Sequence, residues 1–518
     1  MKVLVKKALL SLILLGALHG AARAQTVINA NGATATVFLN YDAGNVRYKI
    51  NNGGYIGITW PCTIINTGTS ILKVLFENDL ILNGVNGYFI CGSGNIQFGS
   101  TSLNTNGTRP VITLDGLVNY PGLIQNGAVG VNGYANIHVY NLQVTLINGS
   151  TLDMFGGWVG QSYFGRGVTG CYFVNCSSDG DIGPGSGGIV GSKAGCDGGK
   201  VTIIGCYSSG SISTDAGGIA GDNAGNGGET IIQYSWSSGD IVGLQAGGIF
   251  GSAAGWGGSA TARNCFSTGG ILGVDTGGVF GKFAGAGVQA NAINSYSRGD
   301  ILGFNAGGIF GARAAELGGS TVANNCYSAG NVTGGNAGGI YGDAKAGGAS
   351  QANTYVANGT WNSAAANAAL TGAPIASPAG VTWANTAVNQ PYDFSTFGYT
   401  PYTRTNISVV GGVPSLVQSY SQTVTPGTSS SAAIISGLNY TILQKKKGNV
   451  VGAYPTITIN STTGVIATTS GTQAGTYTLT IDNEVPGIAS GYCITQVQLT
   501  VNSPPAPPKK NQRPKRSW

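Results

Sequence analysis

The chain has little charge and no long hydrophobic run after its N-terminus, and each shortage excludes a class of protein. Only 8% of the residues are charged, and there are 2 Met against 89 Gly. Long helices are built mainly from Ala, Leu, Glu and Lys, so this composition argues against a helical protein. Disorder is also disfavoured, because 42% of the residues are hydrophobic and the glycines recur periodically. A folded, β-rich chain is expected.

Histidine is the next scarce residue. Beyond the N-terminal segment, His138 is the single histidine, which excludes Ser-His-Asp, Cys-His and multi-histidine zinc sites. It lies in the alternating stretch NIHVYNLQV, so we expect it on a strand, in a surface or stacking role. No Walker loop, HExxH or CxxC sequence occurs. We predict no catalytic residue, no cofactor and no metal site.

The N-terminus predicts export. Three lysines among the first seven residues precede an apolar run over residues 8–18 and the small-x-small sequence Ala22-Arg23-Ala24. This is the pattern of a signal peptide, which we place at residues 1–24. The apolar run is shorter than the roughly 20 residues that span a bilayer, so no transmembrane segment is expected in the mature chain. We expect a secreted or cell-surface protein, with a virion surface as the alternative.

The formal net charge of +6 is concentrated at the two ends. Removing the four basic residues of the N-terminal segment and the five of the last ten residues leaves 16 basic against 19 acidic residues. A slightly acidic body gives no electrostatic reason to bind nucleic acid. Residues 504–518, PPAPPKKNQRPKRSW, are Pro-rich and basic, which predicts a disordered tail.

A repeat of about 30 residues dominates the centre of the chain. Gly-Gly pairs open the strings GGIVG, GGIAG, GGIFG, GGVFG, GGIFG and GGIYG at Gly187, Gly217, Gly247, Gly277, Gly307 and Gly338, and a degenerate copy, GGWVG, begins at Gly156. Two further columns share this spacing, one of Cys or Ser and one of aliphatic residues: Cys176, Cys206, Ser235, Cys265, Ser295 and Cys326, and Ile182, Ile212, Ile241, Ile271, Ile301 and Val332. Each repeat holds two short alternating segments between Gly turns, which indicates strands.

Such a unit cannot bury its own apolar face, so the repeats must stack, about 4.8 Å apart, as a parallel β-solenoid. The Ile and Cys/Ser columns are expected to point inward. A polar column before the Gly pairs is expected to bond turn backbone as a ladder, rather than to hold a metal: Asp215, Gln245, Asp275, Asn305 and Asn336.

The repeat pattern [CS]-[YFW]-S-x-G-x-I-x-G-x-x-A-G-G-I-x-G resembles the GLUG-type repeats of bacterial surface proteins and adhesins, which large DNA viruses also encode. The resemblance covers residues 156–350 and implies a β-solenoid with surface interaction roles. Some GLUG repeats accompany a zinc protease, but its HExxH motif is missing here.

The flanking segments extend this plan. Residues 25–155 are expected to form an N-terminal cap and irregular coils, and residues 351–419 a C-terminal cap and linker. Residues 420–503 contain ITINSTTGVI and AGTYTLTI, which resemble the Ig-like, cadherin-like modules of surface proteins and imply a small β-sandwich.

Nine cysteines occur, an odd number. Most are expected to be buried and unpaired, and a Cys171–Cys176 or a Cys171–Cys196 bridge stays open as an alternative.

The candidate ligand-binding residues form an aromatic column: Tyr207, Trp236, Phe266, Tyr296 and Tyr327. If the preceding Cys/Ser column points inward, alternation turns these rings outward as a strip on which sugars or partner proteins stack. The alternative is that they stack on one another to stabilise the coils. A second column, Phe250, Phe280, Phe310 and Tyr341, poses the same question.

Carboxylates are the remaining chemistry. Asp179 and Asp181 are close in sequence, and Asp240 and Asp300 recur at the position of Asp181 in alternate repeats. Carboxylates about 10 Å apart exceed the separation that glycosidases use, and the repeat itself explains the recurrence. We therefore predict a non-enzymatic, adhesin-like or structural surface protein that binds a glycan or protein partner. The alternative is a polysaccharide lyase or glycoside hydrolase on a β-helix scaffold.

Overall fold

The chain divides into two compact units, residues 1–392 and 393–518. The computed structural model describes residues 25–84, 86–100, 110–293, 295–324, 326–328, 330–352 and 355–356 of the first unit, and 407–410, 413–424, 439–447, 450–451, 456–459, 465–484 and 493–502 of the second. The predicted signal peptide, the basic tail and most of the predicted C-terminal cap and linker lie outside these residues.

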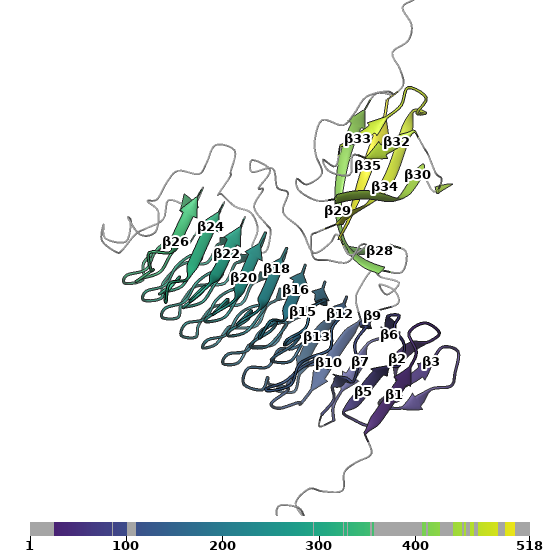
Figure 1. The fold of residues 1–518 in the computed structure, drawn as a ribbon, viewed down its shortest axis with the longest axis horizontal. Coiled ribbons are helices and arrows are strands. Elements are labelled where there is room, and N and C mark those ends of the chain that lie inside the picture. The colour runs from purple at the N-terminus through teal and green to yellow at the C-terminus, as the bar shows by residue number, and fades with distance from the viewer. Residues whose placement is uncertain are drawn as a thin grey trace, which may run out of the picture. The chain divides into compact units, whose positions relative to one another are not determined.

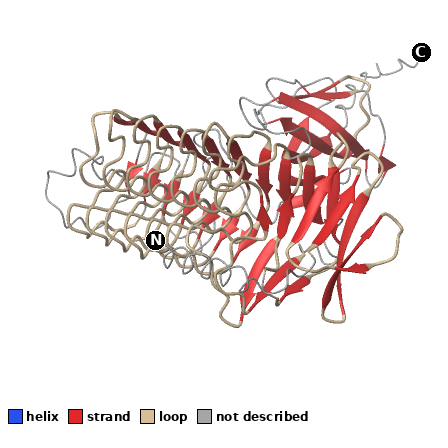
Figure 2. Cartoon of the chain, turned by 60° about the horizontal axis from the view of Figure 1, so that its bottom comes forward, coloured by secondary structure: helices blue, strands red, loops and turns tan. Residues whose placement is uncertain are grey.

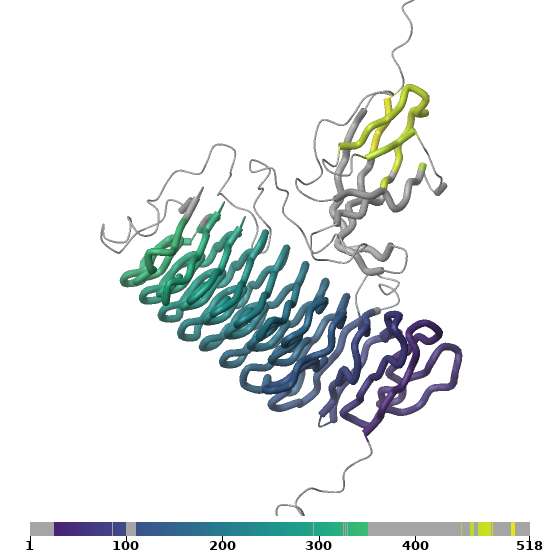
Figure 3. Tube along the Cα trace, viewed as in Figure 1, coloured from purple at the N-terminus to yellow at the C-terminus, as the bar shows by residue number. Residues whose placement is uncertain are grey.

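The first unit is a β-solenoid in which strands from successive coils pair in parallel (Figures 1 and 3). Strands and loops make up the described part of the chain, with no helix (Figure 2), and none of the described residues form an apolar helix long enough to cross a membrane. The predicted all-β, parallel solenoid is confirmed.

Three sheets line the coils. Sheet B contains, in spatial order, β4 (Ile56–Gly57), β3 (Asn45–Ile50), β2 (Thr36–Asp42), β6 (Leu72–Phe76), β9 (Ile96–Ser100), β12 (Ile137–Tyr140), β14 (Cys171–Val174), β16 (Lys200–Ile204), β18 (Glu229–Gln233), β20 (Ser259–Arg263), β22 (Gln289–Ile293), β24 (Ser320–Asn324) and β26 (Ala349–Ala352). Its antiparallel β2–β3–β4 end turns the first edge of the sheet back on itself, which shields that edge from pairing with other chains.

Sheet C contains β7 (Leu80–Leu82), β10 (Val111–Asp115), β13 (Gln143–Ile147), β15 (Ser177–Ser178), β17 (Tyr207–Ser208), β19 (Trp236–Ser237), β21 (Phe266–Ser267), β23 (Tyr296–Ser297), β25 (Tyr327–Ser328) and β27 (Tyr355–Val356). Sheet A contains β1 (Thr26–Ala30), β5 (Cys62–Asn66), β8 (Phe89–Cys91) and β11 (Ile124–Gln125). Downstream, sheet A continues as single parallel bridges, from Ile124 to Gly160 and from Gly160 to Val190.

The Gly pairs stack in one column, as predicted. Parallel bridges join the first glycine of each pair to the next, from Gly187 through to Gly338; we number coils 1 to 6 by these six pairs. A Cβ on the second glycine of coil 2, Gly218, would lie 2.0 Å from the oxygen of Gly248 and 2.7 Å from the Cβ of Ser237. Only glycine fits there.

The degenerate copy is one residue out of the register that the sequence suggested. The structure pairs Gly157, not Gly156, with Gly187. Val159 therefore takes the place of Ile189, to whose carbonyl it donates a hydrogen bond at 3.1 Å. The fixed spacing of backbone pairing decides the alignment, and Trp158 occupies the position of the second glycine.

Two stacks of apolar side chains form the core. The Ile column, Ile182 to Val332, is buried with the alanines that precede the Gly pairs, and the Cys column is buried in a larger cluster with sheets A and B. In that cluster Phe250, Phe280, Phe310 and Tyr341 stack with ring centroids 4.8 to 5.0 Å apart. Both inward predictions are confirmed, and the second aromatic column is core.

Serines of sheet C hold this strand against the Gly pairs. The hydroxyls of Ser178, Ser208 and Ser237 donate to the carbonyls of Gly188, Gly218 and Gly248 at 2.5 to 2.6 Å. Each buried hydroxyl is thereby satisfied by a backbone oxygen ten or eleven residues further on.

Eight of the nine cysteines are described, and all eight are buried and in no disulfide bond. Neither the Cys171–Cys176 nor the Cys171–Cys196 bridge is formed. Burial raises the pKa of Cys265 and of Cys326 to about 12, so these thiols act as small apolar core residues.

The second unit contains a six-stranded and a two-stranded sheet. The larger sheet has the order β28 (Ile407–Val410), β29 (Val413–Val424), β35 (Cys493–Val501), β34 (Gly475–Glu484), β30 (Asn439–Lys447) and β31 (Val450–Val451), and the smaller pairs β32 (Ile457–Ile459) with β33 (Ile466–Thr468). Ile457, Ile466, Leu479 and Leu499 are buried. The Ig-like assignment stays a prediction.

Candidate ligand groove

The predicted aromatic column runs along sheet C, and its rings stack. The centroid distances are 5.1 Å for Tyr207–Trp236, 5.7 Å for Trp236–Phe266 and 4.8 Å for Phe266–Tyr296, and the rings of the last two pairs are nearly parallel. Trp236, Phe266 and Tyr296 are only 6%, 5% and 1% exposed. Tyr207 is half-buried, and Tyr327 pairs with Tyr296 through the backbone.

The expected exposed strip is therefore wrong for Trp236, Phe266 and Tyr296. Alternation along each strand does separate the rings from the Ser column, but it does not place them in open solvent. A ring that is 1–6% exposed offers almost no surface to a ligand, so a candidate site must be sought elsewhere on the solenoid.

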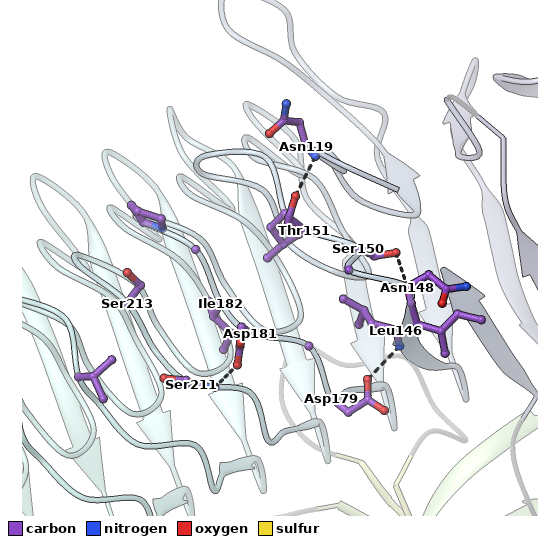
Figure 4. Close-up of a pocket in the computed structure, with 17 residues that line it drawn as sticks. Asn119, Leu146, Asn148, Ser150, Thr151, Asp179, Asp181, Ile182, Ser211 and Ser213 are labelled. Carbon is purple, nitrogen blue, oxygen red and sulfur yellow. Dashed lines mark hydrogen bonds between the residues drawn. The ribbon is translucent and has the colours of Figure 1, made fainter. Parts of the chain in front are cut away.

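A groove with a volume of about 850 Å³ opens where the irregular coils meet coils 1 to 3 (Figure 4). Its polar lining comes from carboxylates, amides and hydroxyls, namely Asn119, Asn148, Ser150, Thr151, Asp179, Asp181, Ser211 and Ser213. Leu146, Ile147, Leu152, Pro184 and Val242 supply apolar patches. Among the described residues, no Lys, Arg or His lines it.

A change in strand length creates the groove. β10 and β13 are five residues long and pair along their whole length, from Val111–Gln143 to Asp115–Ile147. β15 has two residues, so β13 pairs with it only through Gln143 and Val144. The last three residues of β13 are left without a partner strand in coil 1, and the chain of coil 1 turns away beside them.

The carboxylate of Asp179 fills part of this gap. It accepts hydrogen bonds from the Thr145 hydroxyl and, at 3.2 Å, from the Leu146 backbone N–H (Figure 4). A side chain thus replaces the ladder bond that a longer β15 would have made.

Trp158 packs behind the groove lining and fixes one lining residue. Its indole is fully buried and donates to the carbonyl of Gly180, a lining residue, at 3.1 Å. It also stacks with Tyr120, with centroids 6.4 Å apart. The lining at Gly180 is therefore held by packed aromatic rings and is expected to be rigid.

Asp181, Asp240 and Asp300 share one structural task. Each accepts a hydrogen bond from the backbone N–H of the following coil, at 3.1 Å from Ser211, 2.7 Å from Gly270 and 2.8 Å from Asn331. Their recurrence in alternate coils follows from this bond, because Ser211, Gly270 and Asn331 occupy the same position in the coils between.

The polar column before the Gly pairs was predicted to bond turn backbone, but the structure shows hydrogen bonds between its side chains. All five members have positive φ, from 55° to 64°, and three of the side chains bond one another: Asn305 donates to Asp275 at 2.9 Å and Asn336 to Asn305 at 3.3 Å. In coil 4, Asp275 also pairs with Lys282 at 2.8 Å, with both side chains less than one-fifth exposed.

Coil 2 has an aspartate where coil 4 has Lys282. Burial and the nearby charge of Asp215 together raise the pKa of this residue, Asp222, to about 7, against an opposing 2.6 Å hydrogen bond from Asn223. Burial also raises the pKa of Asp215. The two carboxylates form a half-buried acidic pair.

His138, the single histidine expected in the mature chain, lies on β12 and is buried, with its ring edge-on to Tyr172 at 5.0 Å. Burial lowers its pKa to about 4, so it is neutral at pH 7 and takes the stacking role rather than the surface role.

No cluster of three or more His, Cys, Asp or Glu side chains suited to a metal ion occurs among the described residues. No family model, no curated protein and no solved structure matches the chain. The GLUG resemblance therefore rests on the repeat pattern alone.

Sequence reasoning singled out Asp179 and Asp181 but missed the rest of the groove. The signal was present in strand lengths: the alternating run NLQVTLI is longer than the CSSDG segment that stacks on it.

Proposed function

We propose that the chain is an exported, non-enzymatic surface protein whose β-solenoid is a rigid scaffold for adhesion and whose groove binds a neutral or amino-sugar glycan. The observation that carries this proposal is the lining of the groove. Carboxylates, amides and hydroxyls bond sugar hydroxyls, while the leucine, valine and proline patches contact the C–H faces of sugar rings.

Charge narrows the ligand class. Two carboxylates and no basic side chain line the groove, so an acidic polysaccharide would bring like charges together, whereas an ammonium group on a sugar would be attracted. The same argument makes a nucleic acid an unsuitable partner.

Glycan-array binding of the full chain tests the proposal, with Ser213→Leu as the blocking variant. Ser213 lines the groove and directly follows the buried Ile212, in a turn that has one residue fewer than the turns of coils 3 to 5. Its side chain is half-buried, so leucine there should reach into the groove and occlude the ligand, and a melt matching that of the wild type checks the fold. Thr333→Leu makes the same change in coil 6, away from the groove, and should bind like the wild type.

Asp181→Asn gives a second readout. Asparagine keeps the oxygen that accepts from Ser211 but loses the charge, so binding of amino sugars should weaken more than binding of neutral sugars. Equal binding by all four proteins, or binding of acidic glycans alone, would contradict the proposed site.

A carbohydrate-active enzyme is the second candidate, favoured by the presence of Asp179 and Asp181 in one groove. It predicts that the wild type releases new chain ends from a polysaccharide that it binds, and that an Asp179→Asn, Asp181→Asn double variant releases none. Binding without release supports the adhesive function.

A further inference from the structure

Three neighbouring coils expose apolar side chains on the turn that follows the buried Ile column. One column contains Val242, Leu272 and Leu302, which are 49%, 40% and 51% exposed, and the other contains Leu244, Val274 and Phe304, which are 50%, 38% and 50% exposed. We call these six residues the apolar ladder.

The fold turns these side chains outward. A glycine stands between the two columns in each coil, and a Cβ on Gly273 would lie 1.9 Å from the oxygen of Gly243. The glycines therefore face the stack, and their neighbours face solvent.

The core does not require apolar residues at these positions. Coil 6 has Thr333 where the ladder has Val242, Leu272 and Leu302, yet Val332 beside it is fully buried. A contiguous apolar surface that the fold does not need indicates a contact.

We infer that the apolar ladder is a self-association surface, on which two copies of the chain pair ladder to ladder. Six side chains that are about half exposed make a patch on the order of 400–600 Å², the range in which surface patches are often functional. Two such patches together bury about 1,000 Å², the lower bound for a specific interface.

Periodicity and charge both favour a second copy. The stacked rings of the Phe250 column recur every 4.8 to 5.0 Å along the coils, and an identical solenoid matches that spacing over all three coils. The nearby charges are engaged within the chain: Asp240 and Asp300 accept backbone N–H groups, and Asp275 pairs with Lys282. The apolar ladder therefore does not require a partner of opposite charge.

A two-fold axis through coil 4 best aligns the apolar ladders of the two copies. In an antiparallel pair Leu272 and Val274 face their own copies, and coil 3 faces coil 5 of the other chain. All three coils then contribute on both sides.

Sedimentation velocity of the full chain over a range of concentrations tests the inference. The wild type should show a concentration-dependent dimer, and Val242→Ser, Leu272→Thr, Leu302→Thr together should weaken dimerisation by at least about 100-fold. Coil 6 already carries Thr333 there, so the variant should fold, and a matching far-UV spectrum and melt check this. Val288→Thr removes a 46% exposed side chain from the loop before β22 and should dimerise like the wild type.

Disulfide crosslinking tests the arrangement, since all eight described native cysteines are buried. Leu272→Cys should crosslink to itself, and Val242→Cys should crosslink to Leu302→Cys but not to itself. Self-crosslinking of Val242→Cys alone would overturn the antiparallel pairing.

A wild type that stays monomeric at every concentration, or a triple variant that still dimerises, would overturn the inference. Monomeric wild type that floats with phosphatidylcholine vesicles, while the triple variant does not, would assign the ladder to a lipid surface instead. Val242 lines the groove as well as the ladder, so glycan binding is judged on Ser213→Leu and Thr333→Leu, with the oligomeric state of both measured alongside. Failure of either proposal then leaves the other standing.

Discussion

Replacing Asp222 with asparagine should stabilise the protein at pH 8 and have little effect at pH 4. In the folded chain, burial and the neighbouring Asp215 raise the pKa of Asp222 from 3.8 to about 7. Asparagine has nearly the same shape and can still accept the 2.6 Å bond that Asn223 donates to Asp222, but it carries no charge at any pH.

The sign follows from proton binding. Between about pH 4 and pH 7 the folded state holds a proton on Asp222 that the unfolded state has lost, so the free energy of unfolding falls as pH rises through this window. One pKa unit corresponds to about 1.36 kcal/mol, which sets an upper bound of about 4 kcal/mol for the cost of the charged carboxylate. Because Asp222 is half-buried, solvent screening should reduce the observed effect to about 2 kcal/mol.

Urea unfolding of the wild type and Asp222→Asn at both pH values measures this cost, since other groups cancel in the difference between the two proteins. Asp222→Lys is a second test, because it copies into coil 2 the Asp275–Lys282 pair, 2.8 Å long, of coil 4. It should also stabilise at pH 8. Equal stability of wild type and Asp222→Asn at pH 8 would refute the reasoning.

Two further predictions concern packing. Trp236→Ala should lower the free energy of unfolding by about 3–5 kcal/mol, because Trp236 is 6% exposed and stacks on Tyr207 and Phe266. A nearly unchanged melting temperature would contradict this and favour the sequence-based prediction that the ring is exposed. Gly218→Ala should prevent cooperative folding, because its Cβ would lie 2.0 Å from the oxygen of Gly248, whereas Gly183→Ala should be mild, because the nearest atom to a Cβ there is 3.6 Å away. Circular dichroism melts of the two glycine variants decide, and equal melts would contradict the steric argument.

The repeat columns can be placed from the amino-acid sequence alone. When coils of constant length pair backbone to backbone, residues at the same position in the repeat must stack, so the Gly pairs and the Ile and Cys columns could be placed without a structure. Gly187 bridges to Gly217 and Ile212 to Ile241 for this reason. Where the length of the repeat changes, the sequence no longer predicts which residues stack. This happens at Gly156, which lies one residue out of register.

Features that depend on neighbours outside the repeat become visible only in the folded chain. Alternation places Cys206 and Tyr207 on opposite sides of the strand, but it cannot say how much of each ring solvent reaches. The groove arises because β13 is longer than β15, a mismatch between coils that do not resemble each other. Asp215 and Asp222 are seven residues apart in sequence. They form an acidic pair because the fold brings their two half-buried carboxylates close together. Burial and charge proximity depend on all neighbours in space, whereas the repeat specifies only the neighbours directly above and below.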